Sequence, residues 1–176
     1  MKILDATCGA KNMWFQPNHP LVTFMDIREG TFVNWIKRTA DRRIIKVNPD
    51  VIADWSKTLP FENGYFDIIL FDPPHIIKNR EHSGINETHM EVYYGYLFKD
   101  NWREYLSKGI NELFRVLKDE GVFIFKWGER TIKTEDVLKL FPYKPIFGNR
   151  TNGCSANDKN TTWLVFLKYR MEKPLC

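Results

Sequence analysis

Residues 66–75 read FDIILFDPPH, and this stretch decides the fold. Between Asp67 and Phe71 the apolar residues stand at consecutive positions, as expected for a strand that is buried on both faces of a parallel sheet. We therefore predict a central strand here. The two prolines that follow remove two backbone donors, fix φ and force the chain to leave the strand in an extended conformation.

Apolar, β-rich runs alternate with helix-like stretches along the rest of the chain, which predicts a layered α/β fold. The apolar spacing of three and four residues between Trp102 and Leu117 indicates an amphipathic helix that covers the sheet. A second, shorter helix is predicted over 134–140, with Thr134 as its cap and Pro142 after its end. The predicted strands cover 3–6, 22–25, 51–53, 66–71, 121–125 and 162–168.

Two polar segments are predicted as loops. Residues 148–160 are rich in Asn, Gly, Ser and Asp, and they separate 144–147 from the strand that ends the chain, so these two segments are expected to pair as an antiparallel hairpin. The segment from His75 to Asn101 is longer than the roughly 12 to 15 residues usual for structureless connections, which indicates a functional or mobile loop.

Length and composition favour one domain over residues 1–176. Apolar residues make up 43% of the chain and no run reaches the roughly 18 residues of a membrane span, so we expect no membrane partner. The opening MKILD carries charge where a signal peptide is apolar, which favours the cytoplasm. Three scattered cysteines, Cys8, Cys154 and Cys176, indicate reduced thiols. The net charge of +4 is compatible with a polyanionic partner.

The first candidate site is the turn after the first strand, ILDATCGA over residues 3–10. A nucleotide-like cofactor needs a close backbone approach at such a strand end, and Gly9 removes the side chain that would block it. The alternative is an ordinary strand-to-helix turn, since only one glycine is present.

Acidic residues close the next two predicted strands. Asp26 stands about twenty residues after the first turn, where a carboxylate at the end of a strand accepts hydrogen bonds from ribose hydroxyls. Asp54 follows the third strand and could accept a hydrogen bond from an adenine amino group. Each could instead be a solvated acid at the surface.

The third candidate site is the corner Asp72-Pro73-Pro74-His75. Its two prolines hold the Asp72 carboxylate and the Pro73 carbonyl rigidly at the edge of the sheet. Two such acceptors, placed on the hydrogens of an exocyclic amine, favour the pyramidal geometry that frees the nitrogen lone pair for attack on a methyl sulfonium. The alternative is a corner that only ends a strand.

With these residues in hand, the chain resembles the S-adenosylmethionine-dependent amino-methyltransferases that carry an Asp-Pro-Pro-aromatic motif, and among them the small DNA adenine methyltransferases of phages and prophages. The resemblance implies a Rossmann-like, seven-stranded, mostly parallel sheet with an antiparallel C-terminal hairpin and helices on both faces. It also implies S-adenosylmethionine as the cofactor. The cofactor-binding residues it implies are Asp5, Ala6, Thr7, Cys8, Gly9, Asp26, Ile27, Asp54, Trp55 and Asp72, and the catalytic residues are Asp72, Pro73, Pro74 and His75.

The chain departs from the family pattern in three places. The glycine-rich turn is reduced to Gly9, with Ala10 and Lys11 after it. His75 stands where a larger aromatic ring normally stacks on the flipped base, and an imidazole offers less area for this. The first predicted strand begins at residue 3, so the helix that many relatives pack over the cofactor is not expected; a second copy of the chain, a partner subunit or the target loop would cover the cofactor instead.

The expected partner is nucleic acid, DNA in the first place and RNA as an alternative. A base inside a duplex must be flipped out to reach Asp72. Basic and aromatic residues that suit phosphates and exposed bases interleave in the loop 75–101. The candidates for contact are Lys78, Arg80, Tyr93 and Tyr94 from this loop, with Arg150 from the later one. Such a loop can also pack on its own domain.

A second basic set surrounds the segment after Asp26 and is a further hypothesis for nucleic-acid contact, with an ordinary solvated face as the alternative. It comprises Lys37, Arg38, Arg42, Arg43 and Lys46. The histidines lack the spacing of metal ligands, so no metal is predicted.

The sequence thus predicts methyl transfer to the N6 amine of adenine in DNA. The alternatives are the same reaction on RNA, methylation of a protein side-chain amide, and a catalytically silent subunit that binds nucleic acid for a partner methyltransferase. Asp72 at the first position of the motif, where amide enzymes usually have Asn, favours a base.

Overall fold

The computed structural model describes residues 1–36, 41–80, 91, 94–151 and 160–169. The predictions made for Lys37, Arg38, Tyr93, Cys154 and Cys176 concern residues outside these ranges. In chain order the elements are β1 (Ile3–Asp5), β2 (Val22–Asp26), β3 (Gly30–Ile36), β4 (Asp41–Val47), β5 (Val51–Ile52), β6 (Phe66–Phe71), β7 (Ile77–Lys78), β8 (Leu97–Phe98), α2 (Trp102–Val116), β9 (Leu117–Gly128), α3 (Thr134–Leu138), β10 (Phe147–Thr151) and β11 (Thr161–Leu167).

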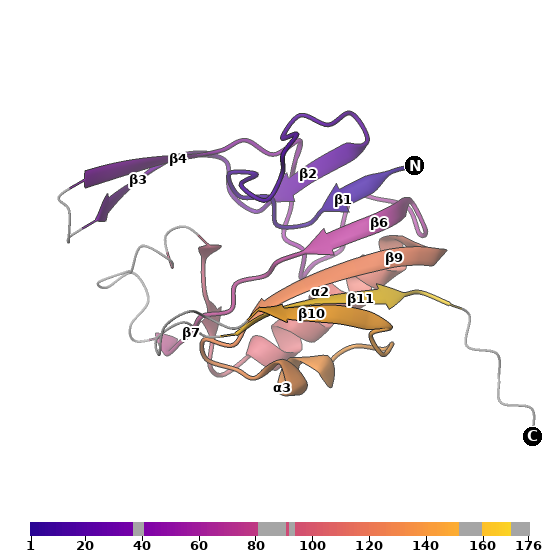
Figure 1. Ribbon diagram of the computed structural model, residues 1–176. Helices are drawn as coiled ribbons and strands as arrows, with labels where there is room; N and C mark the ends of the chain where they lie inside the picture. The colour runs from indigo at the N-terminus through magenta and orange to yellow at the C-terminus, as the bar shows by residue number, and fades with distance from the viewer. Residues whose placement is uncertain (37–40, 81–90, 92–93, 152–159, 170–176) are drawn as a thin grey trace, which may run out of the picture.

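Seven strands form one sheet in the order β10-β11-β9-β6-β1-β2-β5. The pairs β5 with β2, β2 with β1, β1 with β6 and β6 with β9 are parallel, whereas β11 runs antiparallel to both β9 and β10. The predicted mostly parallel sheet with an antiparallel C-terminal hairpin is therefore confirmed. The last strand along the chain, β11, lies between β10 and β9. The first strand, β1, lies beside β6, so the carboxyl ends of β1 and β6 come together (Figure 1).

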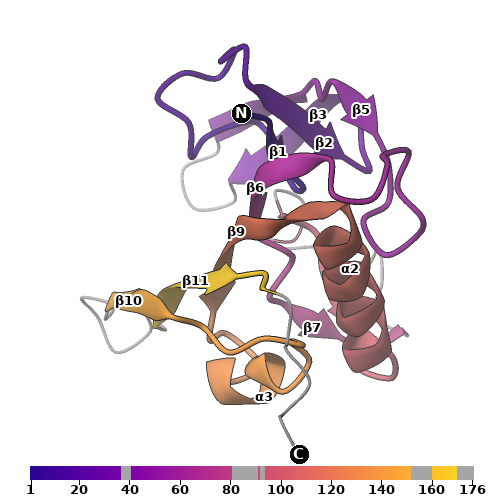
Figure 2. The ribbon, with the colours of Figure 1, turned by 90° about the vertical axis from the view of Figure 1, so that its right-hand side faces the viewer.

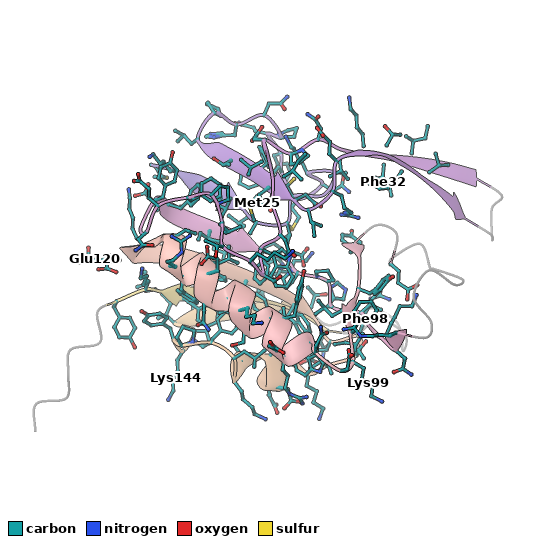
Figure 3. The ribbon with its side chains drawn as sticks, turned by 180° about the vertical axis from the view of Figure 1, so that it is seen from behind. Met25, Phe32, Phe98, Lys99, Glu120 and Lys144 are labelled. Atoms are coloured by element: carbon teal, nitrogen blue, oxygen red, sulfur yellow. The ribbon has the colours of Figure 1, made fainter. Side chains whose placement is uncertain are left out.

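The helix α2 packs against one face of this sheet (Figure 3). Its buried residues include Leu106, Ile110 and Leu113, and these join one apolar cluster with Ile69 of β6 and Phe123 of β9. The predicted helix over 102–117 is confirmed to within a residue. Its apolar spacing of three and four places every buried side chain on the side that meets the strands.

The second described helix, α3, lies on the same side of the sheet as α2 (Figure 2). Val137 of α3 belongs to the same cluster, and Phe141, just after this helix, stacks on Phe166 of β11 with ring centroids 4.4 Å apart. Helices on both faces are thus not confirmed among the residues that the structure describes.

The opposite face of the central strands is only partly covered, and it faces the viewer in Figure 1. Ile68 and Leu70 of β6 and Ile124 of β9 are half-buried, while Ile69, Phe71, Phe123 and Phe125 on the face toward α2 are buried. The expectation that β6 is buried on both faces is wrong for this reason. The part over β2 is closed, because the segment after Gly9 brings Trp14 onto Phe24 with ring centroids 5.3 Å apart.

Residues 30–36 and 41–47, which sequence reasoning did not assign to strands, form the antiparallel pair β3 and β4, and this pair projects away from the sheet (Figure 1). Ile45 and Val47 are buried on its inner face. On the outer face the cross-strand pair Val33 and Ile44 is exposed.

Three predicted details are corrected. Thr134 is the first residue of α3, and Lys133 occupies the cap position without a side-chain cap. Part of the segment 148–160 is strand, because Gly148 to Thr151 pair with β11. The segment 75–101 is not without secondary structure: its ends pair as the short parallel strands β7 and β8.

Candidate active site

A cavity of about 250 Å³ opens at the carboxyl ends of β1, β2, β6 and β9. This is the edge at which ligands bind in open α/β sheets. It is lined by Ala6, Thr7, Cys8, Gly9, Ala10, Asn12, Met13, Asp26, Ile27, Arg28, Trp55, Asp72, Pro74, Tyr94, Gly95, Tyr96, Leu97, Tyr105 and Lys126. The cavity therefore joins the first predicted site and the double-proline corner in one space.

The turn after β1 is held open by Gly9, which has φ +50. A Cβ built at this glycine would meet no atom within 4 Å, so the backbone here borders free space. The Gly9 N–H donates to Asp26 Oδ2 at 2.9 Å, and Asp26 Oδ1 accepts from the backbone N–H of Arg28 at 2.9 Å and from its Nε at 3.1 Å. The carboxylate at the end of β2 thus fixes the turn beside it.

Asp5 lies beneath this turn and is fully buried. Its carboxylate accepts from the Thr7 N–H at 3.1 Å and from the indole Nε1 of Trp14 at 2.7 Å. Burial raises the pKa of Asp5 to about 6, although these two hydrogen bonds act in the opposite direction. Asp5 is not part of the cavity wall; it organises the turn from behind.

Cys8 belongs to the same turn and is a free, buried thiol. Burial raises its pKa to about 12, with a further contribution from the charges of Asp5 and Asp26. A thiol of this kind is not a nucleophile at neutral pH. Its backbone N–H donates to the Met25 carbonyl at 2.8 Å, which ties the turn to β2.

The double-proline corner is tied directly to the first turn. The backbone N–H of Asp72 donates to Thr7 Oγ1 at 3.0 Å, so the residue that begins the corner is anchored to the turn after the neighbouring strand. The Asp72 side chain is only 7% exposed. Burial raises its pKa, and Lys126 opposes this shift.

Lys126 stands beside Asp72 near the end of the adjacent strand β9. Its Nζ lies 2.5 Å from Asp72 Oδ2, and its side chain is 22% exposed. It also lies 3.9 Å from the sulfur of Met13 and 5.7 Å from the ring centroid of Trp163. The part of the cavity beside the double-proline corner therefore contains a largely buried ion pair.

His75 lies behind the corner rather than in the cavity wall. Burial lowers its pKa to about 4, and the positive charges of Lys126 and Arg130 add to this shift. The ring is therefore neutral at physiological pH. Its centroid lies 6.2 Å from that of Trp127, and a Cβ on Gly128 would come within 3.1 Å of the imidazole.

The segment from Tyr94 to Leu97 also lines the cavity, together with Asp72 and Pro74 of the corner. Gly95 has φ +77, and a Cβ there would lie 3.4 Å from Pro74 Cγ, so glycine allows the segment to close on the corner. Tyr94 is 39% exposed, with its ring centroid 6.4 Å from that of His75. Tyr94, Tyr96 and Asp72 thus line the same cavity.

Of the two cofactor-binding residues predicted after the third strand, Trp55 lines the cavity, whereas Asp54, predicted for adenine, does not. Asp54 Oδ1 accepts hydrogen bonds from the Ser56 hydroxyl at 2.7 Å and from the Tyr105 hydroxyl at 2.9 Å. The Trp55 ring packs edge-on against Tyr105 with centroids 4.6 Å apart. Asp54 thus holds this wall together from behind.

The predicted nucleic-acid contacts fall into two groups. Lys78 is largely buried and pairs with Glu91 at 3.2 Å, whereas Arg80 is exposed, pairs with Asp100 at 2.7 Å and lies over the ring of Phe98. Tyr94 lines the cavity. Tyr93 lies outside the described residues. Arg150 is described by its backbone alone, which pairs in β10 with Thr162 of β11.

Sequence reasoning missed several residues of the cavity. Lys126 gave no signal, because a single lysine in a strand belongs to no motif and only the sheet order brings it beside Asp72. Tyr105 lies on α2, and Met13 on the segment that follows Gly9. Arg28 had a usable signal, since it stands two residues after a strand-end acid. The remaining residues in this group are Gly95 and Leu97.

Among the described residues no group of three potential metal ligands occurs. None of the described helices is long and apolar enough to cross a membrane.

No protein-family model matches the sequence, and a search of curated proteins gave no match. Solved structures do match. The PH0226 protein from Pyrococcus horikoshii OT3 aligns with a TM-score of 0.58 at 15% identity, over 95% of this chain and 81% of its own. A SAM-dependent methyltransferase from Methanosarcina mazei aligns with a TM-score of 0.52 at 12% identity, over 96% of this chain and 92% of its own.

A third match is the 1,6-didemethyltoxoflavin-N1-methyltransferase of Burkholderia thailandensis, solved with bound S-adenosylhomocysteine. Its TM-score is 0.53 at 14% identity, over 95% of this chain and 70% of its own. The fold is that of the SAM-dependent methyltransferases. At these identities the likeness concerns the arrangement of strands and not the substrate.

Proposed function

We propose that this chain is a SAM-dependent methyltransferase that methylates the exocyclic N6 amine of adenine in DNA. The observation that supports this most directly is the shared cavity. The Gly9 turn, the carboxylate at the end of β2 and Asp72 all border one space, and Thr7 anchors Asp72 through a hydrogen bond of 3.0 Å.

The residues present fit the cofactor. Gly9 offers backbone beside open space, where a larger side chain would intrude, and Asp26 is a buried carboxylate at the ribose position. Trp55 and Tyr105 provide apolar surface for the adenine ring. When bound, SAM supplies a methyl group whose bond to sulfur breaks as the new bond to nitrogen forms, with the sulfur keeping the electron pair and the nitrogen giving up a proton.

The chain itself supplies orientation and acceptors. In this proposal the Asp72 carboxylate and the Pro73 carbonyl accept hydrogen bonds from the target amine, which turns its lone pair toward the methyl group. The prolines hold both acceptors in place before the substrate arrives, so little reorganisation remains for the reaction itself. Tyr94, which lines the cavity, provides an aromatic face for the base, and the neutral ring of His75 supports the corner from behind.

DNA as the target is supported by the chemistry of the corner and by the basic hairpin. Residues 30–47 contain five basic residues and one acidic residue, so the rest of the chain has 21 of each. A two-stranded ribbon of this kind is narrow enough to enter a major groove. Lys78 and Arg80 are already engaged in ion pairs, so we assign the phosphate contacts chiefly to the hairpin.

The test is incorporation of labelled methyl groups from SAM into separate pools of DNA, RNA, protein and small amines, followed by nucleoside analysis. We expect N6-methyladenine in DNA. Label in RNA or protein alone would replace the substrate, and binding of DNA without transfer would indicate the silent subunit.

Asp72→Ala should lower kcat by at least about 100-fold, because it removes an acceptor that acts in the transition state, and it should change SAM affinity little. Asp67→Ala is the matched control: it lies on the same strand, paired with Lys118 at the opposite end of the sheet. Equal activity of the two variants would contradict the role given to Asp72.

A further inference from the structure

Asp72 and Lys126 continue neighbouring positions of two parallel strands. Phe71 of β6 is in register with Phe125 of β9, so the residues that follow them stand side by side on the same face of the sheet. Both side chains border the cavity, and the contact between them joins Nζ to Oδ2 at 2.5 Å. Asp72 Oδ1 takes no part in this contact.

Arg28 lines the same cavity but is paired with Asp26 at 3.1 Å, so among the described residues Lys126 is the cation in direct contact with Asp72. Asp5 lies below the neighbouring turn and contributes a negative charge, while the buried ring of His75 is neutral at physiological pH. Arg130 follows β9, and its positive charge helps to lower the pKa of His75. The sulfur of Met13 and the ring of Trp163 complete the contacts of Lys126.

Burial without a counter-charge would favour the protonated form of Asp72. A protonated carboxyl group would present a donor on one oxygen and would be a weaker acceptor for an amine. Whether Asp72 is ionised therefore decides whether it can serve the reaction described above.

We propose that Lys126 is a positioning residue of methyl transfer: it holds Oδ2 of Asp72, keeps the carboxylate ionised and leaves Oδ1 to accept the hydrogen bond of the target amine. This inference rests on the proposed function. It also concerns the substrate, since the ammonium group beside Asp72 and the sulfonium of SAM together disfavour a cationic amine. The site is thereby suited to a neutral amine of low basicity, such as that of a nucleobase.

Lys126→Met tests the inference, since methionine is of similar length without the charge. We expect the acidic limb of the pH profile of kcat to move upward by about 1 to 3 pH units, because an opposite charge at this distance shifts a carboxyl pKa by that amount. Activity should return in part at high pH, and Lys126→Arg should restore much of the profile at neutral pH.

Lys118→Met is the matched control. Lys118 lies on the same strand and pairs with Asp67 of β6 at 2.7 Å, so it repeats the same kind of contact far from the cavity. This variant should leave the pH profile unchanged. A loss of activity in Lys126→Met that is the same at every pH, or an unchanged profile, would overturn the inference.

A second measurement does not depend on transfer. Carboxyl carbon NMR of the labelled protein, with the Asp72 signal assigned from Asp72→Asn, reports the protonation of Asp72 directly. The pKa should be higher in Lys126→Met than in the unaltered chain. If no substrate is methylated and this difference is found, the proposed function fails and the pairing stands; if transfer occurs without the difference, the role of Lys126 fails.

Discussion

Asp5 is the buried acid on which the first turn depends, and it makes the stability of the protein depend on pH. Its pKa is about 6 in the folded chain, against 3.8 for a free aspartate. The folded state therefore holds this proton more tightly than the unfolded state does. Stability contributed by the group is greatest below pH 4 and is lost as the pH rises to about 6.

We predict that Asp5→Asn abolishes this loss. In the unaltered chain the contribution of Asp5 to the free energy of unfolding should fall by about 3 kcal/mol between pH 4 and pH 7, because two pKa units correspond to roughly that amount. Urea unfolding of both proteins at several pH values measures the difference. Parallel curves would mean that Asp5 has an ordinary pKa in the folded state.

At the same scale, sequence reasoning identified residues that belong to motifs and missed those that act through neighbours. Asp72 could be found because two prolines follow it. The position of Asp26 came from its distance along the chain. Lys126 could not be found, because its role arises only where β9 lies beside β6. Asp54, assigned to the cofactor, has its Oδ1 occupied by hydrogen bonds from the neighbouring Ser56 and from Tyr105 on α2, which the sequence could not indicate.

Among the elements, α2 packs closely against Trp55 of the cavity wall at Gly109. A Cβ at this position would lie 2.1 Å from Cε3 of Trp55, so this point of the helix has no room for a side chain. A glycine inside a helix destabilises it by about 1 kcal/mol relative to alanine, but here it allows the close packing against Trp55.

We predict that Gly109→Ala destabilises the protein by about 2 to 3 kcal/mol, because overpacking outweighs the gain in helix propensity. SAM affinity should fall as well, since Trp55 lines the cavity. Asn111→Ala, on the exposed side of the same helix, makes a similar gain in propensity without a clash. Denaturant unfolding that ranks the two variants together would show that Trp55 can move at little cost.

The elements also show where patterns in the sequence fail. The strand 66–71 was predicted from its run of consecutive apolar residues, and the helix 102–117 from its apolar spacing of three and four residues. The hairpin of β3 and β4 was not, because Val33 and Ile44 are apolar on its exposed face and hide the alternation that marks a strand. The partly open face of the sheet could not be foreseen either, since consecutive apolar residues suggest burial on both sides.

At the scale of the whole molecule, the net charge of +4 equals the net charge of residues 30–47, and the basic and acidic residues of the rest of the chain are equal in number. We predict that the triple variant Arg42→Gln, Arg43→Gln, Lys46→Gln lowers the salt dependence of DNA binding, with the slope of log K against log salt falling by about 2 to 3. The control is Lys99→Gln, Lys133→Gln, Lys144→Gln, which removes the same charge from exposed positions elsewhere. Equal slopes for the two triple variants would remove the hairpin from the DNA contact.

The uneven placement of charge has a consequence for how the molecule moves. A neutral body with one positive arm has a large electric dipole, and the arm projects at the end toward which β1, β2 and β6 point (Figure 1). Near a polyanion the field exerts a torque as well as a pull, so the molecule rotates while it diffuses. If DNA is the target, as proposed above, this rotation turns the carboxyl ends of the strands, where the cavity lies, toward it before contact.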